Sequence, residues 1–123
     1  MAHNKDWVDV VSKLNEMTQD GKQKWGAYDV SESLTQGTDD KITFVYQTKY
    51  KDWNLAIYEV RFKDYDHQER PFWNSKLVLD FQNDSGESLF KVDDIRALSD
   101  LFESVKYQSA NIKGFLDDFF KED

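Results

Sequence analysis

The chain has 123 residues, which suits one domain, and its lack of cysteine excludes disulfides, thiolate zinc sites and iron-sulfur clusters. Its 24 acidic and 16 basic residues give a formal net charge of -8, which repels phosphate backbones and anionic lipid surfaces. No stretch approaches the ~20 apolar residues that a membrane span requires. Nucleic acids and membranes are therefore disfavoured partners, and we expect a cytoplasmic protein.

The first expected helix covers residues 4–20. Its apolar residues recur at spacings of three and four, which places them on one stripe: Trp7, Val8, Val10, Val11, Leu14 and Met17. Gly21 is placed to end this helix, because glycine adopts the left-handed conformation of a C′ residue without steric cost. Trp25 follows closely, and we expect its ring to pack back on the helix.

An antiparallel meander of four or five strands is expected next. The strands are predicted at residues 41–49, 54–63, 72–81 and 87–92, with a short edge strand within residues 26–40. In the first long strand, alternation predicts one buried face: Ile42, Phe44, Tyr46 and Thr48. In the strand predicted at residues 72–81, the residues expected to face inward are Leu77, Leu79 and Phe81.

The predicted strand at residues 54–63 differs between its two sides. One side is apolar along its whole length: Ala56, Tyr58, Val60 and Phe62. The other side begins with Leu55 and Ile57 and ends with charged residues: Glu59, Arg61 and Lys63. This pattern is typical of a central strand that a helix crosses over only half of its length.

Two helices are expected after the sheet. The first would be capped by Asp93 or Asp94, and it carries Ile95, Leu98, Leu101, Phe102 and Val105 at helical spacing. The second would be capped by Ser109, and it carries Ile112, Phe115, Leu116, Phe119 and Phe120. We expect these two helices to form an antiparallel pair. The predicted fold is a single α+β domain over residues 1–123, with an N-terminal helix, a meander of four to five strands and two C-terminal helices packed on the sheet.

The loop at residues 64–70 concentrates titratable side chains. Asp64, Asp66, His67 and Glu69 combine carboxylate and imidazole, a donor set that suits manganese, zinc or iron. A solvated hairpin loop explains the same composition. This loop, which ends at Arg70, makes a metal-dependent hydrolase or nuclease the enzymatic alternative, with the four side chains named above as weak metal candidates.

Other catalytic patterns have little support. Asp52 followed by Glu59 and Arg61 resembles a magnesium-nuclease pattern, but arginine stands in the place of lysine and does not give up its proton. Neither a Gly-x-Ser-x-Gly sequence nor a glycine-rich phosphate loop is present. No catalytic residue and no cofactor are assigned, and an enzyme is the less favoured class.

Several aromatic and charged residues in and around the central strands are candidates for recognition. Tryptophan, tyrosine and arginine dominate the energetic centres of protein interfaces. The candidate binding residues are Trp53, Glu59, Arg61, Tyr65, Asp66, His67 and Trp73. A recognition patch requires that Trp53, Tyr65 and Trp73 be exposed together.

Acidic residues gather toward the C-terminus: Asp93, Asp94, Asp100, Glu103, Asp117, Asp118, Glu122 and Asp123. Such a surface would steer a basic protein partner, although helix capping and solvation explain the same residues. The sequence thus favours a small acidic binding protein that acts through a protein interface, as inhibitors and immunity proteins do. A regulatory domain is a further alternative, with a small molecule bound between the sheet and the terminal helices near Tyr58 and Phe115.

Overall fold

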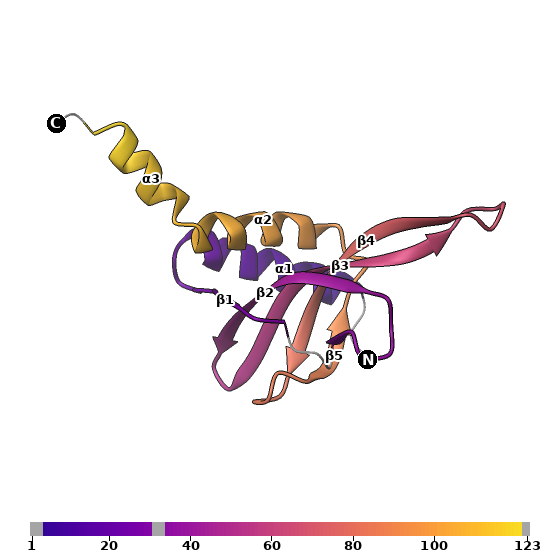
Figure 1. Ribbon diagram of the computed structural model, residues 1–123. Helices are drawn as coiled ribbons and strands as arrows, with labels where there is room; N and C mark the ends of the chain where they lie inside the picture. Colours follow the sequence, from indigo (N-terminus) through magenta and orange to yellow (C-terminus); the bar gives the residue numbers. More distant parts are fainter. Residues whose placement is uncertain (1–3, 31–33, 122–123) are drawn as a thin grey trace.

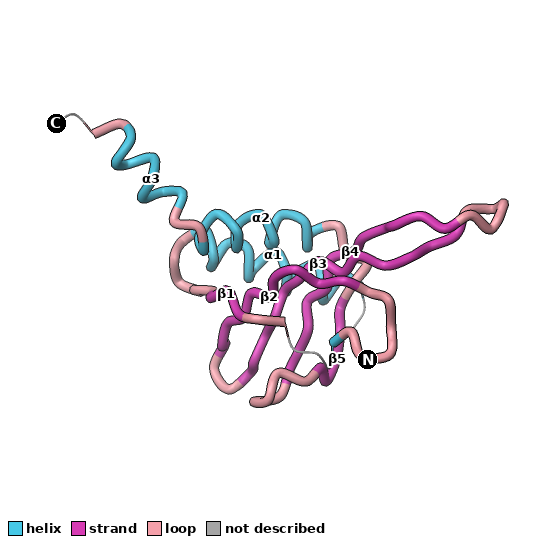
Figure 2. Tube along the Cα trace, viewed as in Figure 1, coloured by secondary structure: helices cyan, strands magenta, loops and turns pink. Residues whose placement is uncertain are grey.

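The computed structural model describes residues 4–30 and 34–121, which form a five-stranded sheet and three helices (Figures 1 and 2). The elements are α1 (Asn4–Gln19), β1 (Gly26–Tyr28), β2 (Lys41–Tyr50), β3 (Trp53–Tyr65), β4 (Pro71–Gln82), β5 (Ser88–Val92), α2 (Ala97–Ser109) and α3 (Ile112–Phe119). The strands lie in chain order, and every neighbouring pair is antiparallel. The predicted α+β meander is confirmed, including the short edge strand.

Helices α1 and α2 lie side by side over one face of the sheet and run in the same direction (Figure 1). Two hydrogen bonds in register fix this arrangement, from Ser104 Oγ to Asn15 Oδ1 and from Gln108 Nε2 to the carbonyl of Thr18. Gly21 ends α1 with a φ of 74°, and the N–H of Lys22 bonds back to the carbonyl of Met17 at 2.9 Å. The predicted end of the first helix is confirmed, because this pairing is that of a Schellman motif.

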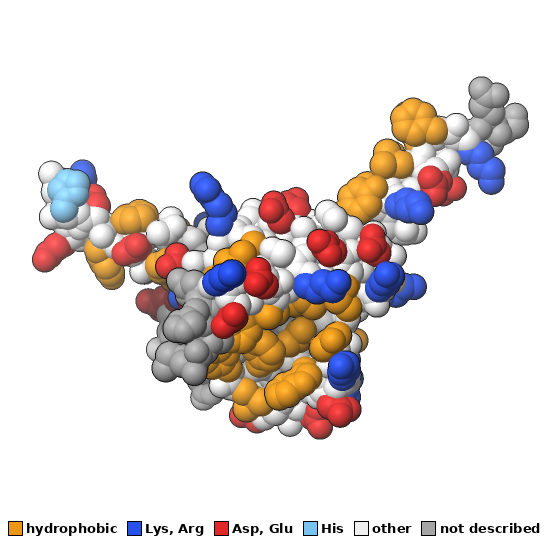
Figure 3. All heavy atoms as spheres, turned by 180° about the vertical axis from the view of Figure 1, so that it is seen from behind, with side chains coloured by type: hydrophobic (Ala, Val, Ile, Leu, Met, Phe, Trp, Pro, Cys, Tyr) orange, Lys and Arg blue, Asp and Glu red, His pale blue; other side chains and the backbone are white. Residues whose placement is uncertain are grey.

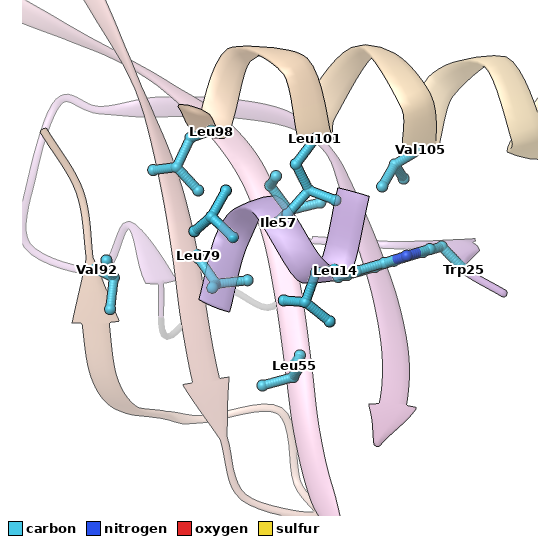
Figure 4. Close-up of a cluster of buried hydrophobic side chains, with 10 residues drawn as sticks. Leu14, Trp25, Leu55, Ile57, Leu79, Val92, Leu98, Leu101 and Val105 are labelled. Carbon is cyan, nitrogen blue, oxygen red and sulfur yellow. The ribbon is translucent and has the colours of Figure 1, made fainter. Parts of the chain in front are cut away.

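The main core lies between these two helices and the sheet (Figure 4). Its buried side chains are Val11, Leu14, Trp25, Leu55, Ile57, Leu79, Val92, Leu98, Leu101 and Val105. Full burial of each aliphatic side chain contributes about 1.5–3 kcal/mol. Trp25 packs back on α1 as predicted, and its indole N–H donates to Thr18 Oγ1 at 3.0 Å.

A second, smaller core covers the opposite face of the sheet. Its buried side chains are Val45, Ala56, Tyr58, Val60 and Val78. Val30 and Leu34, from the segment between β1 and β2, pack against it. The centre of β3 is therefore buried on both sides, whereas Glu59, Arg61 and Lys63 are exposed beyond the helices. The half-covered strand that the sequence predicts is confirmed.

Strand β2 departs from the predicted alternation. Ile42 pairs with Val60 and Val45 with Tyr58, so β2 has one more residue than β3 over this interval, as in a β-bulge. Val45 consequently faces the second core, while Tyr46 packs against the main core. The prediction of one buried face that includes Phe44 is wrong, because Phe44 is 57% exposed.

The C-terminal helices contact the sheet and α1 through α2. Helix α2 begins at Ala97, and its N-cap residue Arg96 makes no side-chain cap hydrogen bond, so capping by Asp93 or Asp94 is not observed. Ser109 belongs to α2, and the left-handed Asn111 (φ 51°) precedes α3 instead. Helix α3 then leads away from the body of the protein and does not fold back as the partner of an antiparallel pair (Figure 1).

Candidate functional site

The far ends of β3 and β4 form a two-stranded arm that stands out from the body (Figure 1). Strand β2 pairs with β3 only as far as the Lys41–Arg61 pair, and β5 pairs with β4 only from Leu79 onward. Residues 62–65 and 71–74, here called the arm together with the loop between them, pair only with each other. No other strand in the part of the chain that the structure describes pairs with their outer backbone edges.

Three cations surround the indole ring of Trp73 at the base of this arm. Lys41 Nζ lies 5.0 Å from the ring centroid, and Arg61 Cζ and Lys63 Nζ each lie 5.8 Å from it. Each such cation–π contact contributes about 0.5–1 kcal/mol at an exposed site. None of the three cations forms an ion pair with any described residue. We call these four residues the cationic patch.

The loop of the arm is organised by Asp66. Its Oδ1 accepts hydrogen bonds from the backbone N–H groups of Gln68 at 2.8 Å and Arg70 at 2.9 Å, and its Oδ2 accepts one from Arg70 Nε at 3.0 Å. The backbone N–H of Arg70 is the main cause that holds the pKa of Asp66 below its usual value. Glu69 adopts the left-handed conformation, with a φ of 59°, and this closes the turn.

Two of the four metal candidates, Asp64 and Asp66, accept hydrogen bonds in or next to this loop. Asp66 uses both carboxylate oxygens within the turn, and Asp64 Oδ1 accepts the N–H of Tyr65 at 2.9 Å. His67 and Glu69 are exposed. Within residues 4–30 and 34–121, no three His, Cys, Asp or Glu side chains are grouped so as to hold a metal ion.

The candidate recognition residues separate into two places. Arg61 and Trp73 meet in the cationic patch, and Tyr65 lies at the end of the same arm. Trp53 lies at the opposite end of the 13-residue β3. Trp53, Tyr65 and Trp73 are 63%, 61% and 41% exposed, so each is accessible, but the three do not form one patch. Glu59 is exposed on the same face as Arg61 and forms no ion pair with it.

An apolar hollow of about 760 Å³ opens between α1 and the sheet, near Trp53. Its lining residues are Trp7, Asp9, Val10, Lys13, Leu14, Met17, Tyr50, Trp53, Leu55, Phe81 and Phe90. Trp7 stacks on Phe90 with ring centroids 5.8 Å apart. Figure 3 shows apolar side chains gathered on this side of the molecule, beneath the charged helix surface. Tyr58 and Phe115, which the sequence places at a ligand pocket, are not among the lining residues.

Helix α3 carries a second apolar surface, and none of its residues is buried. Phe115, Phe119 and Phe120 are 59%, 68% and 76% exposed. The rings of Phe115 and Phe119 stack with centroids 5.7 Å apart. Apolar side chains consequently line the projecting helix (Figure 3). Helical periodicity reveals this stripe in the sequence, but periodicity does not indicate whether a partner covers it.

The C-terminal acidic residues are spread over several elements. Asp93 pairs with Lys76 at 3.2 Å, and Glu103 pairs with Lys106 at 3.0 Å. Asp117 lies on α3 beside Asp118, and both are exposed. Glu122 and Asp123 lie outside the described residues.

A buried carboxylate lies on the face of the sheet opposite α1 and α2. Asp80 is fully buried and accepts hydrogen bonds from Tyr58, Ser88 and Gln82. Burial is the main cause that raises the pKa of Tyr58 well above its usual value, and the negative charge of Asp80 adds to it. Gln82 in turn accepts a hydrogen bond from Gln47, so the network crosses four strands, from β2 to β5.

Among the described residues, no helix is both long and apolar enough to cross a lipid bilayer. Comparison of the chain with protein-family models, with curated proteins and with solved structures finds no match.

Proposed function

We propose that this protein is a cytoplasmic binding protein whose α3 docks in an apolar groove of another protein. The observation that carries the proposal is the apolar stripe of α3: Ile112, Phe115, Leu116 and Phe119. These positions have the i, i+3, i+4, i+7 spacing by which helices anchor in grooves. An eight-residue helix is marginal in water by itself and gains its stability by packing. A partner would supply that packing.

The charges of α3 and of the chain bear on the partner. Asp117 and Asp118 are exposed next to the stripe, and the net charge of the chain is -8. A partner with a basic rim around its groove would therefore associate faster, and proteins with an acidic rim would be repelled. An inhibitor or immunity-type protein that neutralises a basic protein fits this description.

The test uses the full chain as bait in extracts of the source organism at moderate salt. Phe119→Ser removes an exposed ring from the stripe, and Leu89→Ser is the matched control because these side chains are 68% and 67% exposed. Wild type and Leu89→Ser should capture the same protein, and Phe119→Ser should bind it about 30-fold more weakly, as for a residue at the energetic centre of an interface. Failure of wild type to capture any protein, or equal capture by all three chains, would refute the proposal.

A second candidate function is the binding of a small apolar molecule in the hollow beside α1. Its volume of about 760 Å³ falls within the ~300–1,000 Å³ typical of ligand sites, and its lining is mainly aromatic and aliphatic. Binding of the dye ANS would be measured for wild type, Met17→Lys in the hollow and Leu89→Lys outside it. Loss of dye binding in Met17→Lys alone supports this function, and equal binding by all three chains contradicts it.

A further inference from the structure

The cationic patch is built by the pairing of three strands. Lys41 of β2 pairs directly with Arg61 of β3, and Lys63 pairs with Trp73 of β4. Side chains at paired positions share one face of a sheet, so all four lie on the face that α1 and α2 cover farther along. Like charges placed opposite each other on neighbouring strands are destabilising. The fold therefore holds these cations together against their mutual repulsion.

The ion pairs among the described residues form away from the patch. Lys76 is paired with Asp93, Lys106 with Glu103, and Arg70 with Asp66. The three patch cations have no such partner among the described residues, although acidic residues outnumber basic ones by 24 to 16. An anion from outside the chain would add attraction at all three cations at once.

An open strand edge lies directly beside the patch. The pairing of β2 with β3 ends at Lys41, so no described strand pairs with residues 62–65 of β3 on that side. An extended peptide could add there in line with β2, taking backbone hydrogen bonds from β3 as in β-strand addition. Its alternate side chains would then face Lys63 and Trp73.

From this geometry we propose that the arm binds an extended acidic segment of a partner protein. Its carboxylates would contact Lys41, Arg61 and Lys63, and its backbone would pair with residues 62–65. This site is separate from α3, and the proposal does not depend on the function proposed above.

The charges around the patch favour a short acidic peptide over a nucleic acid. Glu59 lies next to Arg61 on the same face, and Asp66 and Glu69 lie in the loop at the tip of the arm. A polyanion with a phosphate at every step would extend past the patch and meet these carboxylates, and it would meet the net charge of -8 at longer range. A segment with a few carboxylates matches the patch without that repulsion.

The test measures binding of a fluorescently labelled peptide, Thr-Glu-Thr-Glu-Thr-Glu, to the full chain by anisotropy at low and at physiological salt. Its three carboxylates alternate along the strand, as the geometry of the patch requires. The double variant Arg61→Gln with Lys63→Gln removes two charges from the patch. The control, Lys22→Gln with Lys24→Gln, removes the same charge from two exposed lysines outside it. Wild type and control should bind with affinity that falls as salt rises, and the patch variant should bind about tenfold more weakly.

Two further measurements make the result decisive. Lys41→Gln changes the patch from another strand, so it should also weaken binding even if the double variant folds poorly. An oligothymidylate of equal charge should bind more weakly than this peptide. The proposal is overturned if wild type does not bind the peptide, if the patch variants and the control bind equally, or if the oligonucleotide binds more tightly.

Discussion

The hydroxyl of Tyr58 donates a 2.9 Å hydrogen bond to Asp80, and both side chains are fully buried. Asp80 also accepts hydrogen bonds from Ser88 Oγ at 2.7 Å and from Gln82 Nε2 at 3.2 Å. No ion pair among the described residues involves this carboxylate. A buried charge is costly unless it is hydrogen-bonded, so the hydrogen bonds from these neutral donors offset the cost of burying Asp80.

Tyr58→Phe should lower the free energy of unfolding by about 1–3 kcal/mol, because it removes one donor from a buried carboxylate and leaves the packing volume unchanged. Urea denaturation at pH 7 measures the change. Tyr28→Phe is the control, since Tyr28 is 56% exposed, and it should stay within about 0.5 kcal/mol of wild type. Equal stability of the two variants would contradict the structural role of the Tyr58–Asp80 bond.

Stability should also fall at high pH because of Tyr58. Its pKa is raised in the folded protein, mainly by burial, above the usual 10.0. The unfolded chain therefore loses this proton near pH 10 while the folded chain keeps it, and the folded state becomes less favoured as pH rises further. The contribution is fully present below pH 10 and decreases by up to about 1.4 kcal/mol per pH unit above it. Urea denaturation from pH 8 to pH 11 should show that the advantage of wild type over Tyr58→Phe shrinks above pH 10, and a constant difference would contradict the raised pKa.

Gln108→Leu should destabilise the contact between α2 and the end of α1. Gln108 Oε1 accepts the N–H of Trp25 at 2.8 Å, and its Nε2 donates to the carbonyls of Gln23 at 2.8 Å and Thr18 at 3.1 Å. Leucine removes this partner from the N–H of Trp25 and the carbonyl of Gln23, which costs about 1–3 kcal/mol. The carbonyl of Thr18 still accepts the N–H of Gly21 at 3.1 Å. Thermal unfolding should show a lower midpoint than for the exposed control Ser109→Leu, and a midpoint equal to that of the control would rule out this role.

Truncation of Leu101 should destabilise the fold strongly and truncation of Phe119 should hardly affect it, although both residues belong to apolar helical stripes. Leu101 is fully buried, so Leu101→Ala should cost about 2–5 kcal/mol. Phe119 is 68% exposed, so Phe119→Ala should change the free energy of unfolding by less than about 0.5 kcal/mol. Denaturant unfolding of both variants checks this, and a large loss in Phe119→Ala would mean that α3 packs on its own chain in solution.

Arg70→Ala should leave the pKa of Asp66 below its usual value. The backbone N–H of residue 70 is the largest cause of the lowering, and alanine keeps it, whereas the arginine side chain contributes less. The loop bonds that favour ionised Asp66 contribute stability above the usual pKa of 3.8, and that contribution is lost as pH falls through the lowered value. Titration of Asp66 by NMR in both proteins measures the shift, and a return to 3.8 in Arg70→Ala would show that the side chain dominates.

Local sequence patterns were sufficient to predict most of the helices and strands. Gly21 marks the end of α1, and the change from Ile57 to Glu59 marks where the helices stop covering β3. Each of these signals concerns a residue and its near neighbours, and burial of one apolar face then selects the pairing. The cationic patch was less accessible to this reasoning, because Lys41 is 32 residues from Trp73 in the chain and only strand pairing brings them together.

The bulge in β2 shows why alternation failed there. Ile42, Phe44 and Tyr46 follow a strict period of two, which predicts one face. The extra residue between Ile42 and Val45 moves the later residues to the opposite phase, so Val45 enters the second core. A bulge changes the register without any change in composition, so alternation within β2 alone does not reveal it. Its position is defined only by the pairing of β2 with β3.

The sequence by itself determined the α+β class, the helix and strand periods, the net charge and the absence of cysteine chemistry. Tertiary structure alone decided which apolar stripes are covered. The stripes of α2 and α3 have similar spacing, yet Leu98, Leu101 and Val105 are buried while Phe115 and Phe119 are exposed. The physical reason is that a helical period specifies a face for packing but not its partner. Helix α2 packs beside α1 over the sheet, whereas α3 leads away from the body of the protein (Figure 1).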